Sequence, residues 1–355
     1  MSILGFVSRR PLVALGAAAG LWWLWPSSSG PPAPARPQAA VLADGFAALP
    51  GGDRIALFDE GAGRRGDLAV DDAPANARVV GVGGHVGLVW RDGKRVAVAV
   101  VGEDGQLEQP TKFGKRVASM CQGVATNEHR FGVAWLESDG SVWFVHGPTS
   151  PRGAGEAVGP GSHGSHGSHG IEAIEALEAL EATAGAPFAE PPKPEICMIA
   201  SAHDKLALLY TEGSRTTLVL CGRSCAAPRR IELPRKAEVL GFGCTRGGCA
   251  IATRAETGAT LATWVTPQGR AQWTKPLPHA SERAAVALAG TGAQVAIAYA
   301  TANEPVVVTA SPAGAIATVW QGASDAAPSL AHAAGRLFVA RLVDGELAGS
   351  VVRAP

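Results

Sequence analysis

The sequence predicts an all-β fold, and three observations lead to this prediction. A short pattern of alternating large and small apolar residues recurs along the chain, as in the segment from Val86 to Trp90. Alternation with a period of two is typical of a β-strand, because successive side chains point to opposite faces of the sheet. The 45 glycines and 25 prolines among 355 residues suit many short strands joined by turns. Helix-favouring residues gather in only one insertion near the middle of the chain.

The spacing of the repeated pattern predicts a seven-bladed β-propeller. The copies begin at Ile55, Val86, Phe131, Leu206, Cys249, Val295 and Leu337. Four of the six steps between them, of 45, 43, 46 and 42 residues, match the length of a four-stranded blade. The step of 75 residues contains the insertion, and the step of 31 residues indicates a shortened first blade. We expect each copy to be the second strand of its blade.

The two ends of residues 39–355 are expected to close the ring of blades. The last blade has room for only three strands before the chain ends. Segment 39–43 precedes the first blade and could supply the missing outer strand. Such pairing would cover a sheet edge that otherwise invites aggregation.

Residues 1–26 have the form of a signal peptide or membrane anchor. Arg9 and Arg10 precede an uncharged apolar run over 11–25, as in an export signal. An A-x-A cleavage site ends at Ala35, whereas the tryptophans Trp22, Trp23 and Trp25 are typical of an uncleaved anchor at a membrane surface. Both alternatives place residues 39–355 outside the cytoplasm, in the periplasm or the extracellular space. A Pro-rich linker spans residues 27–38.

Residues 147–194 are expected to form a disordered, low-complexity insertion within the propeller. His163, His166 and His169 lie in a Ser-His-Gly triplet that is repeated three times. Histidine is a common metal ligand, but the Gly-Ser frame offers no groups to orient these rings. We therefore expect no metal site and no cofactor.

The six cysteines predict a set of disulfides formed in an oxidising compartment. Cys121 and Cys197 occupy nearly the same place on neighbouring inner strands, while the other four bracket two short turns. The expected pairs are Cys121 with Cys197, Cys221 with Cys225, and Cys244 with Cys249. A zinc site would need more regular spacing.

Acidic residues recur in the predicted turns between second and third strands. These turns emerge on one face of a propeller, so an acidic face is expected there. Asp-Gly and Glu-Gly also suit the backbone conformation of tight turns, so acids can occur there without a binding role. Nearby cations such as Arg91 and Lys94 would neutralise part of the charge. The functional alternative is binding of a basic peptide or cationic group. The candidate binding residues are Asp92, Glu137, Asp139, Glu212, Glu256, Glu304 and Asp344.

One blade resembles a known family. The stretch from Ala255-Glu256-Thr257-Gly258 to Trp264, followed by Gly269 to Trp273, is similar to repeats of the pyrroloquinoline-quinone-like propeller superfamily. The whole pattern resembles that of exported bacterial seven-bladed propellers. The resemblance implies the fold, and no functional residue is transferred from it.

These features favour a non-catalytic binding or scaffold protein of the cell envelope that recognises a protein or glycan. The net charge of +0 argues against a nucleic-acid partner, and a monomer is expected. A hydrolase or lyase with its site in the central channel is the alternative, with a quinone-dependent role third. An enzyme of this kind should gather carboxylates or histidines on the inner strands, which are mostly apolar or Gly-rich. His85, His129, His203 and His332 lie instead near turns between first and second strands and are expected at the surface.

Overall fold

The structure is a computed structural model in which Ala35–Pro355 form one compact unit. It describes residues 37–353 apart from positions 43, 50–52, 75, 123–124, 127–129, 149–195, 203–204, 213–214, 222–228, 234–236 and 282–285. The expected signal or anchor segment and almost all of the expected insertion lie outside these residues. No helix of the described part is long and apolar enough to cross a membrane.

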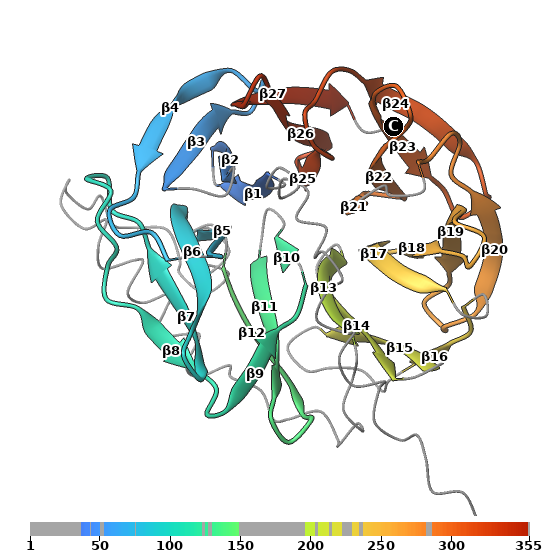
Figure 1. Cartoon of the computed structure of the whole chain (residues 1–355), viewed down its shortest axis with the longest axis horizontal. Helices are drawn as coiled ribbons and strands as arrows, with labels where there is room; N and C mark the ends of the chain where they lie inside the picture. Colours follow the sequence, from blue (N-terminus) through green and yellow to red (C-terminus); the bar gives the residue numbers. More distant parts are fainter. Residues whose placement is uncertain are drawn as a thin grey trace, which may run out of the picture. The chain divides into compact units, whose positions relative to one another are not determined.

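The strands of the described residues form six sheets, arranged in sequence order around a central axis (Figure 1). The first sheet contains β1 (Gln38–Leu42), β2 (Gly45–Leu49), β3 (Arg54–Asp59) and β4 (Arg64–Ala69). The second contains β5 (Arg78–Val82), β6 (His85–Asp92), β7 (Arg95–Val100) and β8 (Thr111–Phe113). The third contains β9 (Val117–Met120), β10 (Ala125–Thr126), β11 (Arg130–Glu137) and β12 (Val142–Pro148).

The largest sheet has eight strands in two antiparallel halves, joined where Ala202 lies opposite Cys244 in a short parallel pairing. One half contains β13 (Ile196–Ala202), β14 (Lys205–Glu212), β15 (Arg215–Cys221) and β16 (Arg229–Ile231). The other contains β17 (Glu238–Thr245), β18 (Gly248–Arg254), β19 (Thr260–Val265) and β20 (Ala271–Pro276). Two further sheets follow. The first contains β21 (Ala287–Thr291), β22 (Gln294–Ala300), β23 (Pro305–Ala310) and β24 (Ile316–Gln321). The second contains β25 (Ser329–Ala333), β26 (Arg336–Val343) and β27 (Glu346–Arg353).

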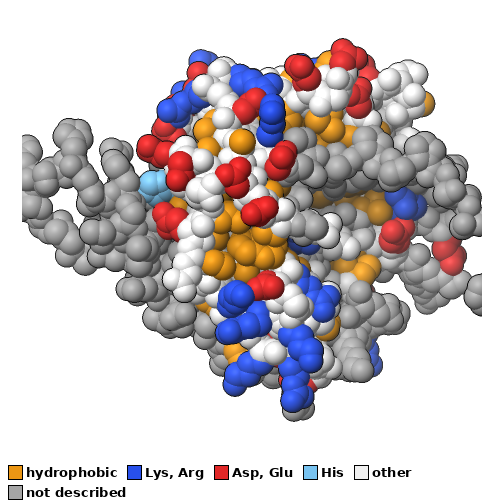
Figure 2. Space-filling view, turned by 60° about the vertical axis from the view of Figure 1, so that its left-hand side comes forward, with side chains coloured by type: hydrophobic (Ala, Val, Ile, Leu, Met, Phe, Trp, Pro, Cys, Tyr) orange, Lys and Arg blue, Asp and Glu red, His pale blue; other side chains and the backbone are white. Residues whose placement is uncertain are grey.

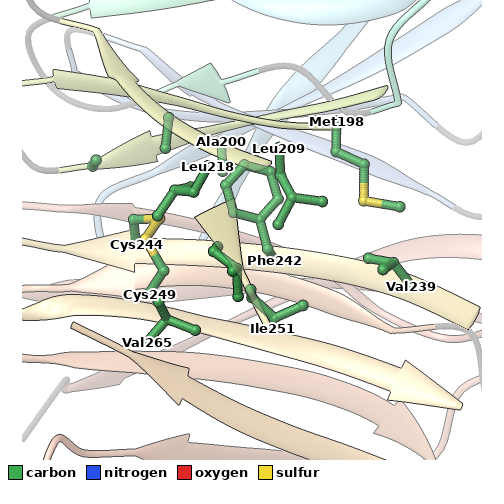
Figure 3. Close-up of a cluster of buried hydrophobic side chains, with 13 residues drawn as sticks. Met198, Ala200, Leu209, Leu218, Val239, Phe242, Cys244, Cys249, Ile251 and Val265 are labelled. Carbon is green, nitrogen blue, oxygen red and sulfur yellow. A yellow bond between two sulfur atoms is a disulfide. The ribbon is translucent and has the colours of Figure 1, made fainter. Parts of the chain in front are cut away.

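The hydrophobic core lies between neighbouring sheets rather than within one central layer. In Figure 3, Met198 and Leu209 from one half of the large sheet face Phe242 and Ile251 from the other half. All four side chains are at most 5% exposed. Burying apolar surface in this way contributes roughly 25 cal/mol per Å². Both faces of most strands are covered by a neighbouring sheet. The alternating side chains seen in the sequence therefore pack into two different interfaces, one on each face of the strand.

The first sheet corrects the predicted strand order. Ile55 lies in β3, which is the third strand of its sheet, whereas β2 is the second strand. Counting from Phe46 in β2, the step to Val86 is 40 residues, so the first sheet is not shortened. Second and third strands are both buried on two faces, and the same apolar pattern therefore fits either one.

The expected closure by an N-terminal strand is wrong. β1 pairs along its whole length with β2 in its own sheet, from Gln38 opposite Leu49 to Leu42 opposite Gly45. Among the described strands, β27 pairs only with β26. Only two residues separate β1 from β2 along the chain, and closing so short a loop costs less chain entropy than pairing with the far end of the chain.

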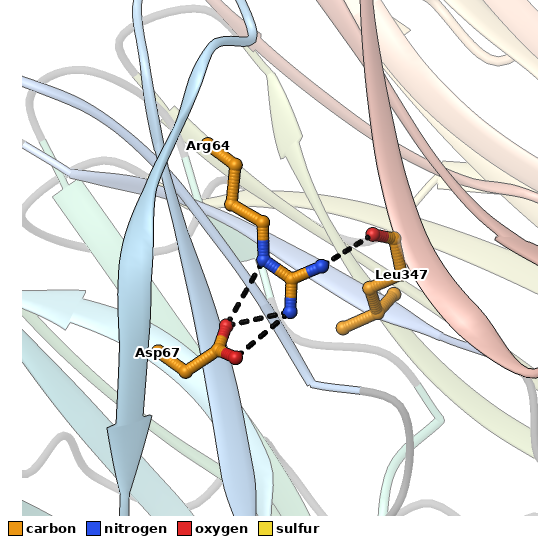
Figure 4. Close-up of polar contacts among 3 residues, drawn as sticks. All are labelled: Arg64, Asp67 and Leu347. Carbon is orange, nitrogen blue, oxygen red and sulfur yellow. Dashed lines mark hydrogen bonds and ion pairs between the residues drawn. The ribbon is translucent and has the colours of Figure 1, made fainter.

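Side chains hold the first and last sheets together instead. The ring of Phe46 stacks on Phe338 with the centroids 4.6 Å apart. Arg64 in β4 donates from Nη1 to the carbonyl oxygen of Leu347 at 3.1 Å, and its guanidinium forms a two-oxygen contact with Asp67 (Figure 4). The ring is thus closed by an aromatic core and a positioned arginine, not by a shared sheet.

Tyr299 gives the fold a testable dependence on high pH. Its side chain is fully buried in β22, and its hydroxyl donates to the carbonyl oxygen of Pro278 at 2.9 Å. Burial raises the pKa of Tyr299 to about 12, because the phenolate would lose its hydration. The neutral phenol therefore contributes stability that is fully present below pH ~10 and is lost as the pH rises from ~10 toward 12.

We expect the wild-type protein to lose about 1 kcal/mol more unfolding free energy than Tyr299→Phe between pH 9 and 11. Denaturant titrations of both proteins at the two pH values measure this difference. Equal losses in the two proteins would show that Tyr299 ionises at its ordinary pKa in the folded state.

Candidate functional site

A cavity of about 330 Å³ is lined by residues of the first strands of the sheets. These strands lie near the centre of the arrangement in Figure 1. Residues from β1, β5, β13, β17, β21 and β25 line it, together with Gln122. This volume is at the lower end of the range for small-molecule sites. Each first strand presents its edge, and not a broad side-chain face, toward the centre. A cavity therefore remains among these strands.

Arg78 is the one permanently charged side chain among the described residues that line the cavity. It begins β5, is half-buried, and donates from Nη1 to the carbonyl oxygen of Cys121. Desolvation by burial lowers the pKa of Arg78, although a guanidinium remains charged at physiological pH. The sequence analysis overlooked Arg78, since a single arginine before a strand is not a recognisable motif.

The rest of the lining is mixed. The side chains of Leu240 and Leu288 are half-buried and supply apolar surface, while Gln38, Gln122 and Ser201 supply amide and hydroxyl groups. No aspartate or glutamate is among the described lining residues. The cavity therefore combines one cation, neutral hydrogen-bonding groups and apolar walls.

His332 lies in a different place from the one expected. It is in β25 and lines the cavity as a half-buried side chain, instead of lying at the surface. The prediction failed because the turn after β25 begins two residues later than the histidine, within the usual error of a strand boundary. His163, His166 and His169 lie outside the described residues. In the described part, no group of three or more His, Cys, Asp or Glu could hold a metal ion.

The candidate acidic residues share one topological position but not one environment. All seven lie at or just beyond the turn end of a second strand. Asp92 forms an ion pair with Lys112, with Oδ2 and Nζ 2.5 Å apart. Glu256 and Asp344 are exposed and Glu304 is half-buried, while the side chain of Glu212 lies outside the description.

Glu137 and Asp139 both have local structural contacts. Glu137 is 9% exposed, and its carboxylate accepts hydrogen bonds from the backbone N–H groups of Lys115 and Arg116, at 2.9 and 3.1 Å. Asp139 accepts from the backbone N–H and the hydroxyl of Ser141, which together lower its pKa, with a smaller contribution from Arg116. Glu137 therefore anchors a loop rather than presenting charge to solvent.

A basic cluster surrounds two of these acids. It is made of side chains on the β6–β7 turn and on the segment around β8, all exposed to solvent: Arg91, Lys94, Arg95, Lys112, Lys115 and Arg116. Figure 2 shows Lys and Arg side chains gathered below a band of hydrophobic side chains on the side that carries β6, β7 and β8. The sequence contains these cations as two short runs, but only the strand pairing shows that they are neighbours.

The loops that carry the basic cluster are fixed by backbone contacts. The N–H of Val117 donates to the carbonyl of Lys94 at 2.9 Å, and the N–H of Ser138 donates to the carbonyl of Arg116 at 2.9 Å. The guanidinium of Arg95 donates to the carbonyls of Lys112 and Gly114. The second and third sheets thereby hold the cations in a defined arrangement.

Two of the three expected disulfides are present. Cys121 is bonded to Cys197 across neighbouring sheets, and Cys244 to Cys249 across a hairpin. Gln122 lies beside β13, donating its N–H to the carbonyl of Cys197 at 2.7 Å. The expected pair of Cys221 and Cys225 lies outside the described side chains.

No protein-family model matches the chain, and no curated protein sequence matches it. Solved structures do match over nearly the whole length. The structure of streptogramin B lyase is 12% identical, has a TM-score of 0.53, and aligns over 90% of this chain and 94% of its own. A catalytically inactive virginiamycin B lyase from Staphylococcus aureus, solved with quinupristin, is 14% identical with a TM-score of 0.52, over 91% and 97% of the two chains.

The chain has the β-propeller fold. At this level of identity the likeness establishes the propeller architecture and nothing about chemistry. In the propeller, the turns between second and third strands and the connections from one blade to the next emerge on the same face. The basic cluster and the turns that bear the seven acids belong to that face by topology.

Proposed function

We propose that the chain is an exported, seven-bladed propeller that binds a protein partner and does not catalyse a reaction. The blade number is supported by the described strands, which form seven successive groups of three or four when the eight-stranded sheet is counted as two. Export is supported by the two disulfides, which persist in oxidising compartments, and by the form of residues 1–26.

The observation that carries the proposal is the basic cluster on its fixed loops. Of the six cations, Lys112 is neutralised by Asp92, and the buried Glu137 is occupied with backbone N–H groups. The six cations still outnumber the nearby acids Asp92, Glu137 and Asp139, so the patch keeps a net positive charge and does not need to order its loops on binding. Such charge complementarity speeds association and selects the partner's orientation.

Three further acids, of which Glu304 is half-buried, define the complementary part of the same face. Glu256, Glu304 and Asp344 are on turns of later blades, remote in sequence from the basic cluster. The binding face we propose is thus divided between cationic and anionic regions rather than uniformly acidic. It suits a partner with a folded surface of mixed charge, which a protein provides more readily than a glycan does.

Charge reversal tests this function with the full chain. The triple variant Lys94→Glu, Lys115→Glu and Arg116→Glu changes three exposed side chains and leaves the backbone contacts of their loops in place. We expect proteins that cross-link to the wild type in an extract of its own cells to be recovered at least about tenfold less with this variant. Quantitative mass spectrometry of the recovered proteins measures the ratio.

The matched control is Arg229→Glu with Arg230→Glu, two exposed arginines on the outer strand β16. It should recover the same proteins as the wild type. Equal recovery with the triple variant, or equal loss with the control, would rule out the basic cluster as the binding surface.

A further inference from the structure

We infer that the outer edge of β27 binds an extended segment of a second protein, which adds a fourth, antiparallel strand to the last sheet. The basic cluster lies on the second and third sheets, so this inference does not depend on the proposed function. It rests on the exposure of β27, on the direction of its backbone groups and on the side chains beside its outer edge.

β27 has the exposure of a third strand that lacks its cover. It is the outermost of the three described strands of the last sheet. β7 and β23 are third strands that a fourth strand covers, and each is buried at all but one of its residues. In β27, Leu347 is buried, whereas residues 348–352 are half-buried.

Two hydrogen bonds show which backbone groups of β27 point outward. Leu342 in β26 lies opposite Leu347, and its carbonyl accepts from the N–H of Asp325 at 2.7 Å, on the edge of β26 that β25 occupies. The carbonyl of Leu347 points the other way and accepts from the β4 arginine of the first sheet at 3.1 Å. Because these groups alternate along an antiparallel strand, the N–H and C=O groups of Gly349 and Val351 also point outward. In the described part of the chain, no strand pairs with them.

The sequence of β27 leaves the middle of this edge open to pairing. Sheet edges are commonly protected by charged side chains. Four of the five described strands in fourth position, β4, β8, β16 and β20, each contain at least one charged residue. β27 has charged residues at its two ends, Glu346 and Arg353, and an uncharged run between them.

Apolar side chains flank the position of the added strand on both sides. Val351 is half-buried and packs against the cluster that contains Phe338 and the aromatic rings of the first sheet. Val352 packs against the neighbouring cluster together with Trp320 of β24, and both are half-buried. Successive side chains of an added strand would point alternately toward these two sides, where they would cover apolar surface.

The ends of β27 determine the chemistry of the partner segment. Neighbouring strands of this sheet are antiparallel, so an added strand would run from Arg353 toward Glu346. Opposite charges stabilise paired strands, and we therefore expect an acid at the N-terminal end of the segment and a base at its C-terminal end. Residues 27–36 of this chain fit poorly, because their three prolines cannot donate to a strand ladder.

Hydrogen exchange of the full-length protein tests the inference with the peptide acetyl-Asp-Thr-Val-Thr-Val-Thr-Lys-amide. We expect the N–H groups of Gly349 and Val351 to exchange at least about tenfold more slowly when the peptide is bound, because they become part of a ladder. Two further peptides carry N-methyl groups on all the threonines or on all the valines. One of them should bind at least about tenfold more weakly and the other should bind like the parent, since one edge of the peptide faces β27.

Val351→Pro removes an outward N–H and leaves the ladder with β26 in place, so it should weaken peptide binding at least about tenfold. Val351→Thr retains the N–H and is the matched control, which should bind like the wild type. Circular dichroism shows whether Val351→Pro is folded, and the two methylated peptides test the inference without any variant.

Unchanged exchange of Gly349 and Val351 with the peptide overturns the inference. Equal binding of the two methylated peptides, or full binding by a folded Val351→Pro variant, overturns it as well. Slow exchange of the same amides without peptide, in a protein that sediments as a dimer, would assign the edge to a second copy of this chain and would also overturn it.

Discussion

A variant with serine at both Cys121 and Cys197 should unfold with a free energy about 4 kcal/mol below that of the wild type. The two cysteines are 76 residues apart, so their bond removes much of the conformational freedom of the unfolded chain. In the folded state the bond also holds Gln122 against β13, where Ile199 donates its N–H to the carbonyl of Gln122 at 3.0 Å. Denaturant titration under non-reducing conditions measures the loss.

The second disulfide is the matched control. Cys244 and Cys249 are five residues apart, and the same chain-entropy argument gives only about 2 kcal/mol for replacing both by serine. If the two double variants lose equal stability, or the order is reversed, loop length does not explain the contribution of these bonds.

Phe338→Ala should lower the unfolding free energy by about 3–5 kcal/mol, a typical loss for a buried phenylalanine. Phe338 is fully buried in β26, stacks on Phe46 and has Phe58 tilted against it with centroids 5.1 Å apart. In the described residues, side-chain contacts and not strand pairing join the first and last sheets. The cavity left by Phe338→Ala therefore removes much of the side-chain contact that closes the ring.

Phe338→Leu retains most of the apolar volume and should lose only about 1 kcal/mol. Thermal and denaturant unfolding of the two variants measures both losses. A loss below about 1 kcal/mol for Phe338→Ala would mean that the aromatic cluster does not hold the two sheets together.

Much of the fold could be predicted from the strand pattern. The copies that begin at Val86, Phe131, Leu206, Cys249, Val295 and Leu337 all lie in second strands, in β6, β11, β14, β18, β22 and β26. The copy at Ile55 was misplaced because a third strand between two sheets has the same alternation. Pairing distinguishes the two, and pairing is not visible in one strand's own residues.

The candidate site was predictable only in part. The sequence placed Asp92, Glu137 and Asp344 correctly at the ends of second strands, but it could not show what surrounds each carboxylate. The contacts of Asp92 with Lys112, and of Glu137 with the loop at Lys115, join residues that are 20 and 22 positions apart. The presence of an acidic residue in a turn therefore does not indicate whether its charge is available to a binding partner.

By itself, the sequence determined the all-β class, the repeat length and two disulfide pairs, because alternation, turn residues and cysteine spacing are local or periodic properties. The tertiary structure alone decided that β1 pairs within its own sheet, that the basic cluster forms, and that Arg78 and His332 face a common cavity. The physical reason is that these features depend on which strands lie side by side. That arrangement follows from the packing of whole sheets around a centre, which no single segment specifies.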